Sequence, residues 1–124
     1  MALKLVPELT CARGVTDIVR SIDWYTRVLN MTLIYHAEDI AWGELTTSVA
    51  KVSLGLGQVE TVKTGGGATL VWGVDDIDAA KAHLDRHGVE QDGEIEHIPG
   101  LVKLLSFRDP DGNDLKFSQN LATG

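Results

Sequence analysis

The chain has 124 residues, of which 44% are hydrophobic and 23% charged, a composition typical of a single globular domain that can bury its own core. Its formal net charge of −7 disfavours nucleic acid and anionic membrane surfaces as partners, and mildly favours a cationic ligand. The single cysteine, Cys11, excludes an intrachain disulfide, and no apolar run reaches membrane-spanning length, so we expect a cytoplasmic protein that does not enter membranes.

The first half of the chain predicts a strand, a helix and three further strands. Residues 5–14 are expected to form the first strand. Asp17 is a favourable N-cap, and apolar residues at helical spacing follow it, so a helix is predicted over residues 18–29 with Asn30 as its left-handed C-cap. The three further strands are expected over residues 31–37, 42–50 and 51–56.

The second half of the chain repeats this order after a connector, residues 58–67, that contains consecutive glycines. We therefore predict one domain over residues 1–124, built from a first βαβββ module at residues 5–57 and a second at residues 68–119. An internal repeat of this kind constrains the fold more strongly than any single motif.

The elements of the second module follow the same order as those of the first. A strand is predicted over residues 68–73, followed by a helix that Asp76 caps and Gly88 ends. The remaining strands are expected over residues 89–97, 101–107 and 114–118. Between the last two strands, the sequence Asp109-Pro110-Asp111-Gly112 has the residues that a tight turn prefers, which predicts a β-hairpin.

Three motifs together resemble the vicinal oxygen chelate superfamily, which includes glyoxalase I, extradiol dioxygenases, fosfomycin and bleomycin resistance proteins, and methylmalonyl-CoA epimerase. The motifs are Val15-x-Asp17-Ile18-x-Arg20-Ser21-x-x-Trp24-Tyr25, Val74-x-Asp76-Ile77-x-Ala79-Ala80 and Asp109-Pro110-Asp111-Gly112-Asn113. The resemblance implies an α+β fold in which two tandem βαβββ modules form a curved mixed sheet around a cavity. It also implies a homodimer and a small-molecule ligand.

The same resemblance indicates where metal-using members hold their metal. The matching positions here are Thr10, Ser53, Thr69 and Lys116. Divalent metals prefer His, Cys and carboxylate ligands, and a charged lysine repels a cation, so we predict neither a metal nor another cofactor. His83 and His87 share one helix face at i, i+4 spacing, but no third ligand is evident beside them.

Strand alternation places further residues on the same faces as these positions. Glu8 shares a face with Thr10, Val71 with Thr69, and both Asp114 and Ser118 with Lys116. Trp42 is the favoured stacking residue, Trp24 and Trp72 are expected in the core, and the direction of His36 is left open. The predicted ligand-binding residues are Thr10, His36, Trp42, Ser53, Thr69, Val71, Lys116 and Ser118.

Two kinds of function agree with this pocket, and a third depends on the strand register. The first is metal-independent binding or sequestration of a small molecule or drug, as the resemblance to bleomycin resistance proteins implies. The second is a glyoxalase-like or epimerase-like lyase or isomerase acting on a carbonyl substrate, in which Lys116 works with Glu8 or Asp114. The third kind, a metal-dependent lyase or dioxygenase, agrees with the sequence only if the predicted strand register is wrong by one residue.

Overall fold

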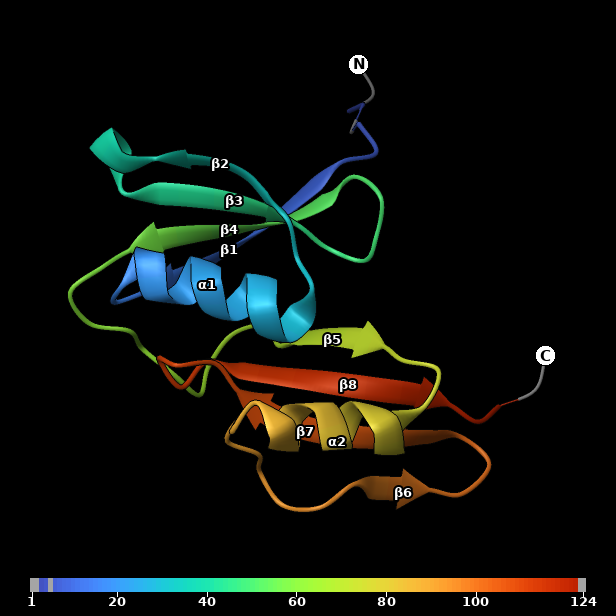
Figure 1. Ribbon diagram of the computed structural model, residues 1–124. Coiled ribbons are helices and arrows are strands. Elements are labelled where there is room, and N and C mark those ends of the chain that lie inside the picture. Colours follow the sequence, from blue (N-terminus) through green and yellow to red (C-terminus); the bar gives the residue numbers. More distant parts are fainter. Residues whose placement is uncertain (1–2, 5, 123–124) are drawn as a thin grey trace. The chain divides into compact units, whose positions relative to one another are not determined.

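The structure is a computed structural model that describes residues 3–4 and 6–122. The chain divides into two compact units, the first ending at Val62 and the second beginning at Lys63, inside the predicted connector. In the described residues, both units follow the order strand, α-helix, strand, strand, strand (Figure 1). The predicted α+β fold with two tandem βαβββ repeats is therefore confirmed.

The first unit contains a four-stranded sheet and one α-helix within the described residues. Its elements are β1 (Leu9–Val15), α1 (Ile18–Leu29), β2 (Leu33–Ala37), the short 3-10 helix η1 (Glu38–Ile40), β3 (Trp42–Thr46) and β4 (Val52–Gln58). The strand order is β1-β4-β3-β2, with β1 parallel to β4 and the other neighbours antiparallel.

The second unit has the same topology. Its elements are β5 (Leu70–Gly73), α2 (Ile77–Arg86), β6 (Glu96–Ile98), β7 (Val102–Arg108) and β8 (Asp114–Asn120). The strand order is β5-β8-β7-β6, with β5 parallel to β8. Each unit thus forms its own mixed sheet. None of the helices in the described part of the chain is long and apolar enough to span a membrane.

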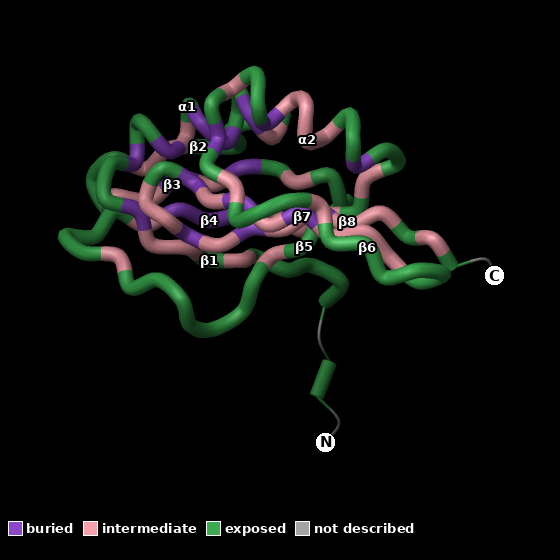
Figure 2. The backbone as a smooth tube through the Cα atoms, turned by 90° about the horizontal axis from the view of Figure 1, so that it is seen from below, coloured by how far each residue is buried: buried purple, intermediate pink, exposed green. Residues whose placement is uncertain are grey.

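Helix α1 begins and ends where the sequence predicts. The side chain of Asp17 accepts a hydrogen bond from the backbone N–H of Arg20 at 3.1 Å, and Asn30 has the left-handed φ of 55°. Buried residues of α1 and of its sheet occupy the layer between helix and strands (Figure 2). These core residues include Ile18, Trp24, Tyr25 and Val28 on α1, and Leu45, Leu54 and Leu56 on the strands.

Helix α2 covers one face of the second sheet in the same way. Asp76 accepts hydrogen bonds from the backbone N–H groups of Asp78 and Ala79, both at 3.1 Å. Ile77 and Leu84 are fully buried on the helix. The sheet contributes Leu105, Phe107, Leu115 and Phe117 to the core. Trp72 lies opposite Phe117 in the register, on this helix-covered face, as predicted.

A glutamine at the end of the last strand caps the helix in each unit. Gln58 Oε1 accepts a hydrogen bond from the backbone N–H of Ile18 at 3.0 Å, across 40 positions of the chain. In the second unit, Gln119 Oε1 accepts from the backbone N–H of Ile77 at 2.8 Å, across 42 positions. The repeat seen in the sequence therefore extends to a matching tertiary contact that joins each helix to its sheet.

The turn between β7 and β8 is held by a buried carboxylate. Asp109 is 4% exposed, and its side chain accepts from the backbone N–H groups of Asp111 and Asn113 at 3.0 and 2.9 Å. The Asn113 amide Nδ2 donates to the second oxygen at 2.9 Å. Gly112 has φ 83°, a conformation that a glycine adopts without strain. These bonds hold residues 109–113 together as one compact turn.

Several predicted strands are shorter than expected. The described residues 6–8 precede β1, and β2 and β5 each begin two residues later than predicted, at Leu33 and Leu70. The strand predicted over residues 42–50 ends at Thr46. Thr47 Oγ1 accepts from the backbone N–H of Val49 at 3.1 Å, and Lys51 has a left-handed φ of 63°. The prediction was wrong at this end because the threonine side chain supplies local hydrogen bonds that favour a turn over extended pairing.

The strand predicted over residues 89–97 is also interrupted. Only Glu96–Ile98 forms a strand at its end, and upstream Gln91 makes an isolated bridge with Phe107. Between them, Gly93 has φ 78°, which turns the backbone out of the extended conformation.

Candidate functional site

The first sheet has one face covered by α1 and one face that no helix of its unit covers. We call the second the helix-free face. Leu54 and Leu56 of β4 lie on the α1 side and are fully buried, so Ser53 and Gly55 point to the helix-free face. The register places Thr10 opposite Ser53 and Glu44 opposite Gly55, which puts both on the helix-free face as well.

Polar side chains on this face form a network that converges on Glu44. Ser53 Oγ donates to Glu44 Oε2 at 3.0 Å, and Thr10 Oγ1 lies 3.1 Å from Ser53 Oγ. The Tyr35 hydroxyl donates to Glu44 Oε1 at 3.3 Å. Trp42 Nε1 donates to Tyr35 Oη at 3.1 Å and to Glu44 Oε1 at 3.3 Å. Four strands of the sheet therefore each place one or two side chains in a single connected group.

The indole of Trp42 lies flat against the sheet beside this network. A Cβ built at Gly55 would overlap Cζ2 and Cη2 of the indole, and one at Gly57 would lie 3.5 Å from Cε3. Only the absence of a side chain at Gly55 lets the ring approach the backbone so closely. Trp42 is half-buried, and its N–H is held by Tyr35 and Glu44, so the ring plane is fixed.

A hollow of about 370 Å³ opens beside the network at Thr10, Glu44 and Ser53, and neither Trp42 nor Tyr35 is among its lining residues. Its lining includes Glu8, Thr10 and Ser53, which the sequence predicted to lie together, and also Glu44. The turn at residues 47–51 contributes further lining residues. The volume is at the lower end of the range found for pockets that hold drug-sized molecules.

Sequence reasoning missed Glu44 and Tyr35. The signal for Glu44 was present, since Trp42, Glu44 and Thr46 alternate with Gly43 and Leu45 along one strand. Tyr35 carried no such signal. The register between β2 and β3 shifts between Leu33 and Tyr35, and alternation does not reveal an irregularity of this kind.

The structure places His36 away from the other candidates. His36 pairs with Gly43, and a Cβ at Gly43 would meet Ile22 and Ile18 of α1. Paired residues share a face, so His36 lies on the α1 side of the sheet, opposite to Thr10 and Ser53. His36 therefore does not share the face on which these hydroxyls lie.

In the second unit, the predicted residues gather on the helix-free face of the second sheet. Lys116 alternates with the buried Leu115 and Phe117, and the register sets Val71 opposite Lys116. Ser118 shares this face by alternation. Thr69 is exposed and lies just before β5 begins.

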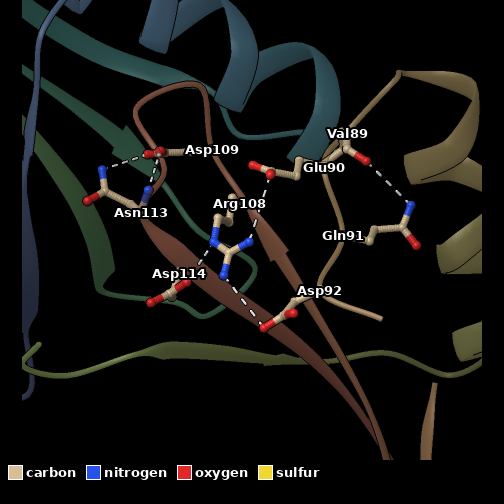
Figure 3. Close-up of polar contacts among 8 residues, drawn as sticks. All are labelled: Val89, Glu90, Gln91, Asp92, Arg108, Asp109, Asn113 and Asp114. Carbon is tan, nitrogen blue, oxygen red and sulfur yellow. Dashed lines mark hydrogen bonds and ion pairs between the residues drawn. The ribbon is translucent and has the colours of Figure 1, made fainter. Parts of the chain in front are cut away.

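Asp114 pairs with an arginine and not with Lys116 (Figure 3). Arg108 Nε donates to Asp114 Oδ1 at 3.2 Å, and the same guanidinium lies 3.5 Å from Asp92 Oδ2 and 3.9 Å from Glu90 Oε1. Among the described residues, no carboxylate lies within ion-pairing distance of Lys116. The predicted Lys116–Asp114 pair is therefore replaced by an Arg108 cluster, which ties the segment before β6 to the last hairpin.

The side chains at the family's metal positions do not match what divalent metals prefer. In the first unit, Thr10 and Ser53 offer neutral hydroxyls that already bond to one another. In the second unit, Lys116 offers an ammonium group with no lone pair. No group of three or more His, Cys, Asp or Glu side chains in the described chain is arranged to hold a metal ion.

The fold and this site define a class of protein, a small α+β protein of two βαβββ units with a ligand-sized hollow on a sheet face, lined by apolar side chains and a few polar groups. The chain belongs to the Glyoxalase/Bleomycin resistance protein/Dioxygenase superfamily, whose family model matches residues 9–117. No curated protein matches the sequence at a significant level.

Several solved structures share the fold. A superfamily member from Sphaerobacter thermophilus is 21% identical over 95% of this chain and 100% of that one, with a TM-score of 0.80. TnmS3, an antibiotic binding protein from Streptomyces, is 23% identical over 96% and 99% of the two chains, with a TM-score of 0.75. The fosfomycin resistance protein FosX from Listeria monocytogenes is 13% identical over 96% and 95%, with a TM-score of 0.77.

Proposed function

We propose that this protein binds a small planar molecule, without a metal, on the helix-free face of its first sheet. The observation that carries the proposal is the seating of Trp42. Its ring lies on glycine backbone and its N–H is fixed by two acceptors, so the ring is preorganised before any ligand arrives. A rigid aromatic surface stacks a planar ligand at little entropic cost.

The neighbouring hollow supplies the polar part of such a site. Ligand pockets commonly combine apolar and aromatic walls with a few placed polar groups. Here Thr10, Glu44 and Ser53 provide those groups. Shared folds with an antibiotic binding protein and with a fosfomycin resistance protein support a drug or natural product as the ligand. Sequestration of that ligand, inside the cytoplasm and by a homodimer, is the role we propose.

The stacking role is tested with a planar probe. We expect acridine to bind the protein and the variant Trp42→Ala to bind it about tenfold more weakly, because the aromatic surface is lost. Isothermal titration calorimetry measures both affinities. Trp72→Phe is the matched control, since Trp72 lies on the helix-covered face of the other sheet and its loss should leave binding unchanged. Equal affinities for the native protein and Trp42→Ala would contradict the proposal.

Metal independence is tested separately. Because the family's metal positions hold two threonines, a serine and a lysine, protein purified without chelators should contain far less than one equivalent of Zn, Ni, Fe or Mn per chain. Elemental analysis by mass spectrometry measures this content. Acridine affinity should also be the same before and after dialysis against EDTA. One bound equivalent per chain would overturn this part of the proposal.

An enzymatic role for Lys116 has weaker support. General acid–base catalysis by a lysine requires a partner or an environment that adjusts its pKa, and Asp114, one of the two predicted partners (the other is Glu8), is bound to Arg108. No arrangement in either unit favours turnover over binding, so binding is the function we propose.

A further inference from the structure

The number of protons that each side chain carries fixes the direction of the hydrogen bonds around Glu44. A serine hydroxyl carries one proton, and that of Ser53 is donated to Glu44 Oε2. In the 3.1 Å contact between Thr10 and Ser53, Thr10 must then be the donor. Tyr35 likewise donates to Glu44, and Trp42 has only a donor to offer. Every polar proton of the network is therefore donated within it, to Glu44, to Ser53 Oγ or to Tyr35 Oη.

The network consequently presents acceptors and no donors to whatever enters the hollow. Thr10 Oγ1 and the Glu44 oxygens retain lone pairs, since each carboxylate oxygen accepts from more than one direction. A ligand group that accepts hydrogen bonds would find no free proton in this network, and Lys51 at the rim of the hollow is the charged donor in the lining. A ligand group that donates would find several acceptors around one negative charge.

The charge on Glu44 has no counterion in the described part of the chain. All its hydrogen-bond donors are neutral groups, and no lysine, arginine or histidine of the described residues forms an ion pair with it. Glu8 and Lys51 also line the hollow, but both are exposed and their opposite charges offset each other. The half-buried Glu44 therefore leaves the hollow with a net negative charge.

We infer that Glu44 is the specificity-determining residue for a cationic ligand. An ammonium or similar charged donor of this ligand binds the Glu44 carboxylate, and a planar ring of the same ligand stacks on Trp42. This inference rests on the proposed binding function and names the class of ligand. A charge-assisted hydrogen bond is about twice as strong as a neutral one, and a cation near an aromatic face gains further attraction. Trp42 Nε1 donates to Glu44 at 3.3 Å, so the carboxylate lies at the edge of the indole ring.

Three probes that share one ring system separate charge from stacking. They are 9-aminoacridine, which is cationic at neutral pH, acridine, which is neutral, and acridine-9-carboxylate, which is anionic. We expect the native protein to bind 9-aminoacridine about tenfold or more tightly than acridine, and to bind the anion most weakly. Calorimetry at low ionic strength measures all three, since salt screens such interactions.

The variant Glu44→Gln keeps the size and one acceptor oxygen of the side chain and removes its charge. This variant should lose the preference for 9-aminoacridine. Its affinity for acridine should change less than threefold, which is a smaller change than the loss of a typical hydrogen bond causes. Glu8→Gln is the matched control, because it removes an exposed carboxylate from the same hollow and should retain most of the preference. Circular dichroism confirms that both variants are folded.

The outcomes distinguish the inference from the function on which it rests. If 9-aminoacridine and acridine bind equally to the native protein and both lose affinity in Trp42→Ala, the proposed function stands and the cationic preference is wrong. If the preference survives Glu44→Gln but is lost in Glu8→Gln, Glu44 is not its source. If no probe binds in a Trp42-dependent way, both proposals are overturned.

Discussion

At the scale of single residues, Gly55 decides whether the site can exist. The indole of Trp42 occupies the space that any side chain at this position would need. Gly55 has an ordinary strand conformation, so its role is to allow close approach and not to relieve backbone strain. The stacking surface thus depends on a residue that contributes no functional group.

Gly55→Ala should therefore damage both the stability of the protein and the site. We expect it to lower the free energy of unfolding by about 1–3 kcal/mol, because the added methyl group displaces a packed ring. We also expect a changed near-UV circular dichroism spectrum and weaker acridine binding. Urea denaturation gives the stability, and calorimetry gives the affinity.

Gly57→Ala provides the control on the same strand. Its added methyl group would lie 3.5 Å from the Trp42 ring, which is ordinary van der Waals contact. Its stability should stay within about 0.5 kcal/mol of the native protein, as for substitutions that create no clash. Equal effects of the two substitutions would show that the ring does not lie where the structure places it.

At the scale of elements, each helix is joined to its own sheet through a glutamine. The first N–H groups of a helix have no partner within the helix, so an acceptor from elsewhere stabilises that end. Gln58 and Gln119 supply this acceptor from the last strand of each unit. The capping aspartates Asp17 and Asp76 directly precede their helices in the sequence. Each helix start therefore has one acceptor that is local in sequence and one that is distant.

Removing either glutamine acceptor should weaken its unit. Gln58→Ala and Gln119→Ala are each expected to lower the free energy of unfolding by about 1 kcal/mol, the usual net contribution of one hydrogen bond. Gln→Glu at the same positions keeps the acceptor and adds a negative charge at a helix N-terminus, so these variants should retain the native stability. Urea denaturation of the four variants measures the differences. Alanine variants as stable as the glutamate variants would contradict the capping role.

At the scale of the whole molecule, the edge strand β2 offers a surface on which a second copy of the chain could pair. β2 pairs with a neighbour on one side only, and its Leu33, Ile34 and Tyr35 are 39%, 52% and 46% exposed. Exposed apolar residues on an unpaired strand edge favour association with another chain. This feature supports the homodimer that the family resemblance implies.

We therefore predict that the native protein sediments at micromolar concentration with twice the 13.4 kDa chain mass. Leu33→Lys should shift the species toward the monomer if β2 lies in the contact, because a charge on an edge strand opposes pairing. Val19→Lys is the control, since Val19 is an exposed apolar residue on α1, 68% accessible. A native protein that sediments as a monomer would refute the dimer.

The sequence by itself determined the elements and the order in which they repeat. Asp17, Asn30 and Asp76 set helix ends through bonds to nearby backbone, and such contacts can be predicted from neighbouring residues. Alternation also gave the correct face for Lys116, because the adjacent Leu115 and Phe117 must be buried. These predictions succeeded because the deciding partner lay within a few positions along the chain, although the local hydrogen bond of Thr47 that ends β3 was missed.

Only the tertiary structure decided which side chains meet. Glu44 became the centre of the site because register brought Ser53 and Tyr35 to it from other strands, and the register shift in β2 decided the face of His36. Asp114 was expected beside Lys116 but binds Arg108, which lies across the hairpin from it. Contacts of this kind depend on how strands align, and a register that slips by one residue reverses every face, so local sequence does not specify them.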